Sequence, residues 1–229
     1  MKRMLSIMFI LALIPTVCFS QNATGEFNLF GGIALPQGDF KDDPDDPDSG
    51  LAKTGFGVGV NHIRPLTTPG MSWITSAALL YNGMEVDESD YDLDYYGIDV
   101  TVDAGAWINI PIMTGLKYET EVSPTMKIYG LGQVGINMVK APKLEIKASS
   151  SSSSVKAETE YDMASSFGYV FGGGIVLSEK ISVGLRYFAL GEPKIKGTVK
   201  ASGGGESDSE KFELKQSISV LLLMVELSL

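Results

Sequence analysis

The stretch Lys215–Leu229, KQSISVLLLMVELSL, constrains the fold most, because its residues alternate with the period of a β-strand. One side of it is apolar throughout and comprises Leu221, Leu223, Val225, Leu227 and Leu229. Roughly ten residues with an apolar face are enough to cross a membrane as a tilted strand. A strand in lipid cannot leave its edge unpaired, so this interpretation requires a closed barrel. The alternative is a buried strand of a soluble sheet, which is apolar on both faces.

Seven earlier segments alternate in the same way, and helical periodicity is missing. The eight predicted strands are Glu26–Pro36, Thr54–Ile63, Met71–Met84, Trp107–Glu119, Met126–Met138, Ser165–Leu177, Ile181–Leu190 and Lys215–Leu229. The connections between them alternate long and short in strict order. Outer-membrane barrels have an even number of strands, short periplasmic turns and long outer loops. The pattern predicts an all-β, eight-stranded antiparallel up-and-down transmembrane β-barrel, with four long extracellular loops and three short periplasmic turns.

Met1–Ser20 has the pattern of a signal peptide: Lys2 and Arg3, then an apolar run too short to span a membrane, then a small residue. We therefore expect a leader over 1–20 and an outer-membrane β-barrel domain over 21–229. Cys18 is the only cysteine, so the mature chain would have neither disulfide nor thiol chemistry.

The chain is acidic, and loss of Lys2 and Arg3 with the leader changes its net charge from −10 to −12. Such a charge disfavours nucleic acid and anionic membrane surfaces as partners. No residue pattern indicates a cofactor, and we expect a monomer.

Three short stretches resemble recurrent motifs of a known family. They are Leu35–Phe40 (LPQGDF), Ile108–Ile112 (INIPI) and Tyr129–Gly132 (YGLG). Together they resemble the outer-membrane protein β-barrel domain family, the small eight-stranded barrels of Gram-negative bacteria. The resemblance implies a place in the cell outer membrane, contact with outer-membrane lipid and insertion by the outer-membrane assembly machinery.

Pro111 cannot donate to a sheet ladder, so we predict a β-bulge there.

An acidic run follows the first predicted strand and offers oxygen ligands for Ca²⁺. The candidate ligands are Asp39, Asp42, Asp43, Asp45, Asp46 and Asp48. The run lacks the spaced acids, central glycine and closing glutamate of an EF-hand loop. The alternative, which we favour, is a solvated loop kept extended by like charges and by two prolines.

Charged residues also recur on the polar sides of the predicted strands. Arg186 and Glu226 face inward on adjacent strands, and Lys117, Glu119 and Lys127 face inward on two others. A charged interior is compatible with a pore, but the side chains of an eight-stranded barrel fill its interior. We therefore predict an interior charge network that cross-links the barrel.

Alternation continues beyond the predicted membrane edge in Tyr96–Val102, Lys143–Lys147 and Lys194–Lys200, with tips at Ser149–Ser154 and Gly203–Gly205. Strands that run on past the lipid would form a protruding sheet with open edges, a surface suited to adding a strand from a partner. The second loop is acidic, whereas the third and fourth are lysine-rich, so we expect them to pair. This favours a structural or adhesion-like role with an extracellular protein partner bound through the loops.

Two other functions remain open. The first is a soluble periplasmic barrel that holds an apolar ligand, as lipocalins do. The second is an outer-membrane enzyme that modifies lipid, which would need a histidine beside a hydroxyl group. The chain has one histidine, His62, which the pattern places on the lipid-facing side near the periplasmic end. We therefore expect no enzymatic activity.

Overall fold

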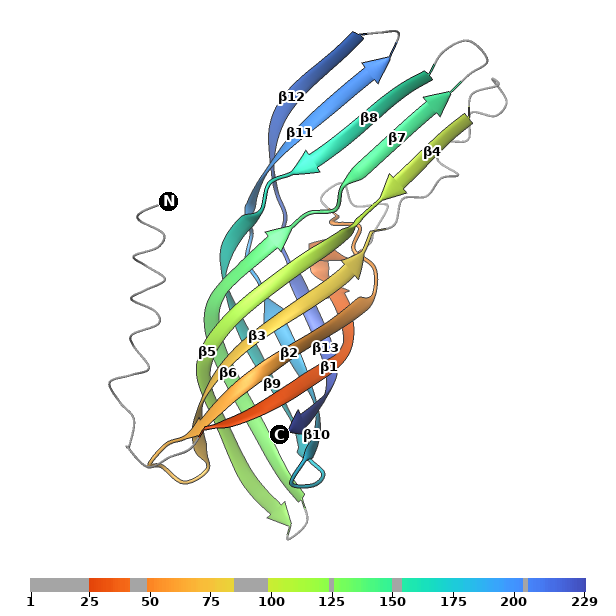
Figure 1. Ribbon diagram of the computed structural model, residues 1–229. Helices are drawn as coiled ribbons and strands as arrows, with labels where there is room; N and C mark the ends of the chain where they lie inside the picture. Colours follow the sequence, from red (N-terminus) through yellow and green to blue (C-terminus); the bar gives the residue numbers. More distant parts are fainter. Residues whose placement is uncertain (1–24, 42–48, 85–98, 124–125, 150–153, 204–205) are drawn as a thin grey trace.

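Eight strands of the computed structural model close into an antiparallel barrel (Figure 1). They are β1 (Glu26–Gln37), β2 (Gly55–Pro65), β3 (Met71–Gly83), β5 (Ala106–Ser123), β6 (Met126–Lys140), β9 (Ala164–Val176), β10 (Ile181–Ala189) and β13 (Ser219–Ser228). Each pairs with the next barrel strand along the chain, and β1 pairs with β13 to close the ring. The structure describes residues 25–41, 49–84, 99–123, 126–149, 154–203 and 206–229. In these residues, no helix is long and apolar enough to cross a membrane.

The predicted up-and-down barrel is confirmed, with differences at the strand ends and at one proline. The closing strand begins at Ser219 rather than Lys215, and β5 continues to Ser123 rather than ending at Glu119. The predicted bulge at Pro111 is wrong, because Pro111 pairs in register with Asn137 of β6. Towards β3 the ladder is interrupted at Pro111 and resumes in the same register. The register shift in β5 lies instead between Glu121 and Ser123.

The two faces of the barrel strands differ as the alternation predicts. Along β13, Leu223, Val225 and Leu227 are exposed on the outer surface, whereas Leu222 and Met224 are buried inside. The other strands repeat this arrangement. The outer apolar side chains include Phe27, Leu29, Ile33, Phe56, Val58, Leu79, Tyr81, Ile112, Leu116, Tyr118, Ile128, Val134, Phe167, Tyr169, Phe171, Ile175, Ile181 and Leu185. A contiguous apolar surface of this extent, on a barrel without free edges, is the surface of a protein that spans a lipid bilayer.

A second sheet continues from one end of the barrel (Figure 1). It has the strand order β12-β11-β8-β7-β4. Its strands are β4 (Asp99–Ala104), β7 (Leu144–Ser149), β8 (Ser154–Tyr161), β11 (Lys194–Gly203) and β12 (Glu206–Lys215). The connections over residues 66–70 and 177–180 lie at the opposite end of the barrel, as do the end of β5 and the start of β6. We call this second sheet the protruding sheet. Its hairpins β7–β8 and β11–β12 turn at the predicted serine and glycine tips.

The ends of the first loop fold into the mouth of the barrel beside the protruding sheet. The short helix η2 (Gly38–Phe40) directs Phe40 into the interior, where its ring contacts Trp107 edge-on at a centroid distance of 5.4 Å. The Trp107 Nε1–H donates a hydrogen bond to the carbonyl of Gly50 (2.8 Å), and the Gln216 side-chain amide donates one to the carbonyl of Asp39 (2.8 Å). Asp39, the described member of the acidic run expected to be solvated, is exposed, and the other five aspartates lie outside the described residues. The described ends of the loop extend the apolar core across the mouth.

The outward face of β13 can be tested with a single charge. Leu223 lies in the middle of β13 and is 43% exposed on the outer surface. We expect Leu223→Arg to destabilise the folded barrel in lipid by roughly 2–4 kcal/mol, because the charge would face hydrocarbon. Urea titrations in liposomes would measure the cost, with Leu223→Ala as the control that removes apolar area without adding charge. Insertion of Leu223→Arg with wild-type stability would show that this face does not meet lipid.

Candidate functional site

Strands β4, β7, β8 and β11 of the protruding sheet have one apolar and one charged face. Across neighbouring strands, Val102 lies opposite Ile146, Ile146 opposite Ala157, and Ala157 opposite Ala201. At the base of the sheet, this apolar face continues the barrel core through Ile195, which is fully buried. The register places the charged side chains of the same strands on the other face. The sheet is therefore a continuation of the barrel wall, with its apolar side contiguous with the interior.

Ion pairs join β7 and β8 on the charged face. Glu145 lies opposite Glu158 and Lys147 opposite Lys156, so each rung alone would be repulsive. Glu145 contacts Lys147 at 2.7 Å and Lys156 at 3.1 Å. Glu158 contacts Lys156 at 3.1 Å and Lys143 at 2.6 Å. The charges of the two rungs therefore neutralise one another.

The ion pairs also shift the pKa values of their members. Hydrogen bonds from Lys147 and Lys156 lower the pKa of Glu145 to about 2. Hydrogen bonds to Glu158 and Glu145 raise the pKa of Lys156 above its usual value. Since the pKa of Glu145 is lowered on folding, its contribution to stability is present above the unfolded pKa near 4.5. That contribution is lost as pH falls from there towards 2.

The pairing predicted between the acidic second loop and the lysine-rich loops cannot be followed, since Glu85–Asp94 lie outside the described residues. Within the described residues, the glutamates that pair with Lys143, Lys147, Lys156 and Lys200 belong to β7 and β8 themselves. The third loop thus supplies both signs of charge.

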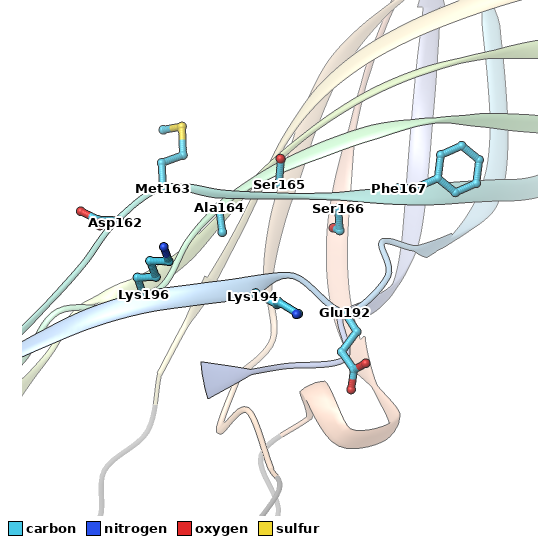
Figure 2. Close-up of a pocket in the computed structure, with 9 residues that line it drawn as sticks. All are labelled: Asp162, Met163, Ala164, Ser165, Ser166, Phe167, Glu192, Lys194 and Lys196. Carbon is cyan, nitrogen blue, oxygen red and sulfur yellow. The ribbon is translucent and has the colours of Figure 1, made fainter. Parts of the chain in front are cut away.

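A hollow of about 700 Å³ lies between the start of β9 in the barrel and the start of β11 in the protruding sheet (Figure 2). Its lining residues are Asp162, Met163, Ala164, Ser165, Ser166, Phe167, Glu192, Lys194 and Lys196. We call it the β9–β11 hollow. Figure 2 shows that two strands contribute to it: the start of β9 with the residues just before it, and the start of β11. It therefore lies between the apolar outer surface and the charged face of the protruding sheet.

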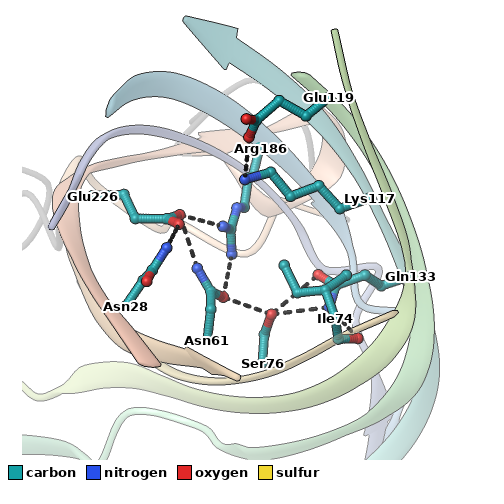
Figure 3. A network of polar contacts seen from close by, with 9 residues as sticks. All are labelled: Asn28, Asn61, Ile74, Ser76, Lys117, Glu119, Gln133, Arg186 and Glu226. Carbon is teal, nitrogen blue, oxygen red and sulfur yellow. Dashed lines mark hydrogen bonds and ion pairs between the residues drawn. The ribbon is translucent and has the colours of Figure 1, made fainter. Parts of the chain in front are cut away.

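The barrel interior holds a buried polar network centred on Arg186 and Glu226 (Figure 3). The Arg186 guanidinium donates to Glu226 at 2.8 Å and to the side-chain oxygen of Asn61 at 3.0 Å. Glu226 also accepts hydrogen bonds from Asn28 (2.6 Å) and Asn61 (2.8 Å). Ser76 donates to Asn61 at 2.7 Å. Five hydrogen bonds thus link strands β1, β2, β3, β10 and β13 across the interior.

Arg186 is 1% exposed and Glu226 is 4% exposed, so neither charge reaches bulk water. The guanidinium also lies 4.5 Å from the centre of the Phe30 ring, in a cation–π contact. Glycine at Gly172 makes room for it, since a Cβ there would lie 2.9 Å from the Arg186 Cγ. Opposite charge, amide groups and an aromatic face together compensate the desolvation of this arginine.

The other three residues of the predicted network form a separate group nearer the short turns. Glu119 contacts Lys117 at 3.1 Å and Lys127 at 3.6 Å. The Lys117 ammonium lies 4.7 Å from the centre of the Tyr129 ring, which is buried in the interior. Among the described residues no ion pair joins this group to Arg186 or Glu226. The five predicted residues therefore form two groups rather than one network.

The predicted metal ligands and the single histidine lie elsewhere. Asp42, Asp43, Asp45, Asp46 and Asp48 are outside the described residues, and Asp39 is exposed within η2. In the described part of the chain no three acidic, histidine or cysteine side chains come together as a metal site. His62 packs against Phe27 with ring centroids 4.8 Å apart. No hydrogen bond of the described residues joins His62 to a hydroxyl group.

The buried pair gives a thermodynamic prediction. Glu226→Ala should destabilise the barrel by about 3–5 kcal/mol, because it leaves the buried Arg186 without its counter-charge. Arg186→Met in the Glu226→Ala background should recover part of that loss, because no buried charge then remains. Urea unfolding in detergent micelles would measure the four free energies of the double-mutant cycle. Additive single effects would contradict the coupling.

Searches against known proteins give structural similarities only. No family model matches the chain, and no curated protein sequence matches it. Neisserial surface protein A is 8% identical over 91% of this chain and 99% of its own, with a TM-score of 0.45. Ail, the attachment invasion locus protein of Yersinia pestis, is 16% identical over 90% and 99%, with a TM-score of 0.41. A major outer membrane protein from Thermus thermophilus is 10% identical over 90% and 98%, with a TM-score of 0.45.

The location of the protein follows from its own geometry. All eight barrel strands have two neighbours, the outer surface is apolar, and the polar groups lie inside. Closure satisfies the backbone groups that lipid cannot, and the outward apolar band is that of an outer-membrane barrel. The protein is an eight-stranded β-barrel of the cell outer membrane.

Proposed function

We propose that this barrel acts at the cell surface as an interaction protein, with the protruding sheet as the surface that binds an extracellular protein partner. The barrel would anchor the sheet as a monomer in outer-membrane lipid after insertion by the assembly machinery. In this account the chain has no open pore, no cofactor and no enzymatic activity, and residues 1–20 are a leader that is removed.

The edges of the protruding sheet carry the proposal. Within the described part of the chain, β12 pairs only with β11 and β4 only with β7, so each presents one row of backbone donors and acceptors that no described residue pairs. A partner strand can add to such an edge through main-chain hydrogen bonds. Asp208, Glu210, Lys211 and Glu213 are exposed along β12. These charges disfavour indiscriminate strand pairing and favour a partner with complementary charges.

The packed interior supports an anchor rather than a channel. Arg186, Asn61 and Gln133 extend across one level of the barrel (Figure 3), and Leu222, Val170 and Met113 are buried inside as well. Phe40 and Trp107 add an apolar plug at the mouth. A barrel of eight strands is just wide enough for its side chains to fill.

The two other functions have less support. A soluble ligand carrier would leave the aromatic and aliphatic side chains of the outer face in water, which the apolar band disfavours. A lipid-modifying enzyme would need its histidine beside a nucleophile, whereas His62 contacts the ring of Phe27. The interaction role is therefore the one that the geometry supports best.

Shortening the β11–β12 hairpin tests the proposal. Thr198 and Lys211 lie directly opposite one another, so residues 199–210 can be replaced by an Asn-Gly turn without changing the register of the remaining rungs. We expect the shortened protein to reach the outer membrane and to keep the different gel mobility of unboiled and boiled samples. Cells that display it should lose attachment to other cells and to protein-coated surfaces.

His62→Ala is the control variant, because the interaction role does not use the histidine. We expect His62→Ala cells to attach like wild-type cells. Wild-type attachment by the shortened variant would overturn the role of the sheet. Loss of a lipid-modifying activity in folded His62→Ala would favour the enzyme.

A further inference from the structure

The β9–β11 hollow combines an apolar rim with a charged one. Met163 is 63% exposed and Phe167 is 67% exposed, more than any other large apolar side chain of the described residues except Leu229. In Figure 2 Met163 points to the side of the chain opposite Ala164, and Phe167 continues the outer apolar row of Tyr169 and Phe171. Exposed apolar side chains of this size at the upper end of the membrane-facing band indicate contact with lipid chains.

The charged rim consists of Lys194 and Lys196 from β11, with Asp162 and Glu192 beside them. All four side chains are exposed. Among the described residues, none of them lies within 4.0 Å of an opposite charge. The lysines of β7 and β8 on the same sheet face differ in this respect, since each contacts a glutamate.

The register places a second lysine opposite Lys194 of the charged rim. Lys194 lies directly opposite Lys215 of β12, and like charges in that position repel. The comparable rung of Lys147 and Lys156 is neutralised by Glu145 at 2.7 and 3.1 Å. The next rung on the same face pairs Lys196 with Glu213, yet no ion pair forms there among the described residues. An anionic group placed between Lys194 and Lys196 would relieve this repulsion.

We propose that the β9–β11 hollow binds the headgroup of a phospholipid that carries hydrogen-bond donors beside its phosphate. Lys194 and Lys196 hold the phosphate, and Asp162 and Glu192 accept hydrogen bonds from the ammonium or hydroxyl groups of the headgroup. The acyl chains lie against Met163 and Phe167. A volume of about 700 Å³ is within the range of small-molecule sites and suits one headgroup with the first part of its chains.

The carboxylates explain why the acidic charge of the chain does not exclude this ligand. A phosphate alone would meet two positive and two negative side chains in the hollow, with little net attraction. A headgroup with both a phosphate and donors satisfies both sets. Phosphatidylethanolamine has both, whereas phosphatidylcholine has the phosphate without N–H or O–H donors. The hollow should therefore distinguish these two lipids, although their net charges are equal.

Native mass spectrometry of the full barrel, released from detergent after titration with each lipid, tests the proposal. We expect retention of phosphatidylethanolamine at concentrations at least tenfold lower than for phosphatidylcholine. The double variant Lys194→Gln/Lys196→Gln should lose retention of both lipids by tenfold or more. Asp162→Asn/Glu192→Gln should bind both lipids equally, because only the donor contacts are removed. Phe167→Ala should weaken both lipids to the same extent.

Lys147→Gln/Lys156→Gln is the matched control, because it removes two lysines from the same sheet face outside the hollow. We expect it to retain lipid like the wild type. Equal loss in this control would show that general charge, not the hollow, attracts the lipid. Wild-type retention by Lys194→Gln/Lys196→Gln would also overturn the proposal. So would displacement of the lipid by inorganic phosphate at equal concentration, which would indicate a free anion site.

The gel mobility of unboiled samples shows whether each variant is folded before its lipid binding is compared. The lipid measurement uses the isolated barrel and no protein partner. Lys194 and Lys196 also remain in the variant with the shortened β11–β12 hairpin. The lipid site and the surface interaction can therefore fail independently.

Discussion

The whole structure depends on pairing every backbone N–H and C=O group that faces lipid. Water cannot satisfy these groups in the hydrocarbon layer, so a sheet that crosses it has to close on itself. Here closure depends on one seam, between β1 and β13, where ten rungs run from Asn28 and Ser228 to Gln37 and Ser219. The segments at the two ends of the described chain thus hold the barrel together. The apolar outer rows follow from closure, since alternate residues of every strand face outward.

Closure also determines what the interior must do. Alternation directs Arg186 and Glu226 away from lipid, and the narrow interior brings them to 2.8 Å. A buried ion pair is weak evidence for stability, because desolvation can exceed the attraction between the charges. The hydrogen bonds that Glu226 accepts from Asn28 and Asn61 nevertheless connect the pair, on β10 and β13, to β1 and β2. Such a network favours one register over its neighbours, because a slip of β10 or β13 by one residue would turn the charge of that strand towards lipid.

Period-2 alternation was enough to predict the eight strands and both of their faces. The alternation is visible in the sequence because outward side chains meet lipid and are apolar, whereas many inward side chains are polar or small. The alternation predicted only some of the interior partners of Arg186. It shows which side chains point inward, but their height along the barrel axis depends on the tilt and stagger of the strands. For this reason Lys117, Glu119 and Lys127 were expected in one network with Arg186 and form another group. Pro111 was expected to bulge, but one missing donor is tolerated without a change of register.

The loop structures were predictable where they continue the alternation and not where they depend on distant partners. Lys143–Lys147 and Lys194–Lys200 alternate, and both lie largely within strands of the protruding sheet. Burial of Phe40 could not be inferred from an acidic loop, because its partner Trp107 is far away in the sequence. The β9–β11 hollow was missed for the same reason. Its residues come from two segments that only the barrel brings together.

Cross-linking across the closing seam tests the account most directly. Ile33 and Leu223 are opposite one another on β1 and β13, and Leu185 lies one strand further on β10. With cysteines at Ile33 and Leu223, a short thiol-reactive cross-linker should join the two strands in isolated outer membranes. The joined chain should change its mobility on denaturing gels. The pair Ile33→Cys with Leu185→Cys should remain unlinked. Linkage of this control pair without linkage of the seam pair, or recovery of the protein in the soluble fraction, would contradict a closed barrel in the outer membrane.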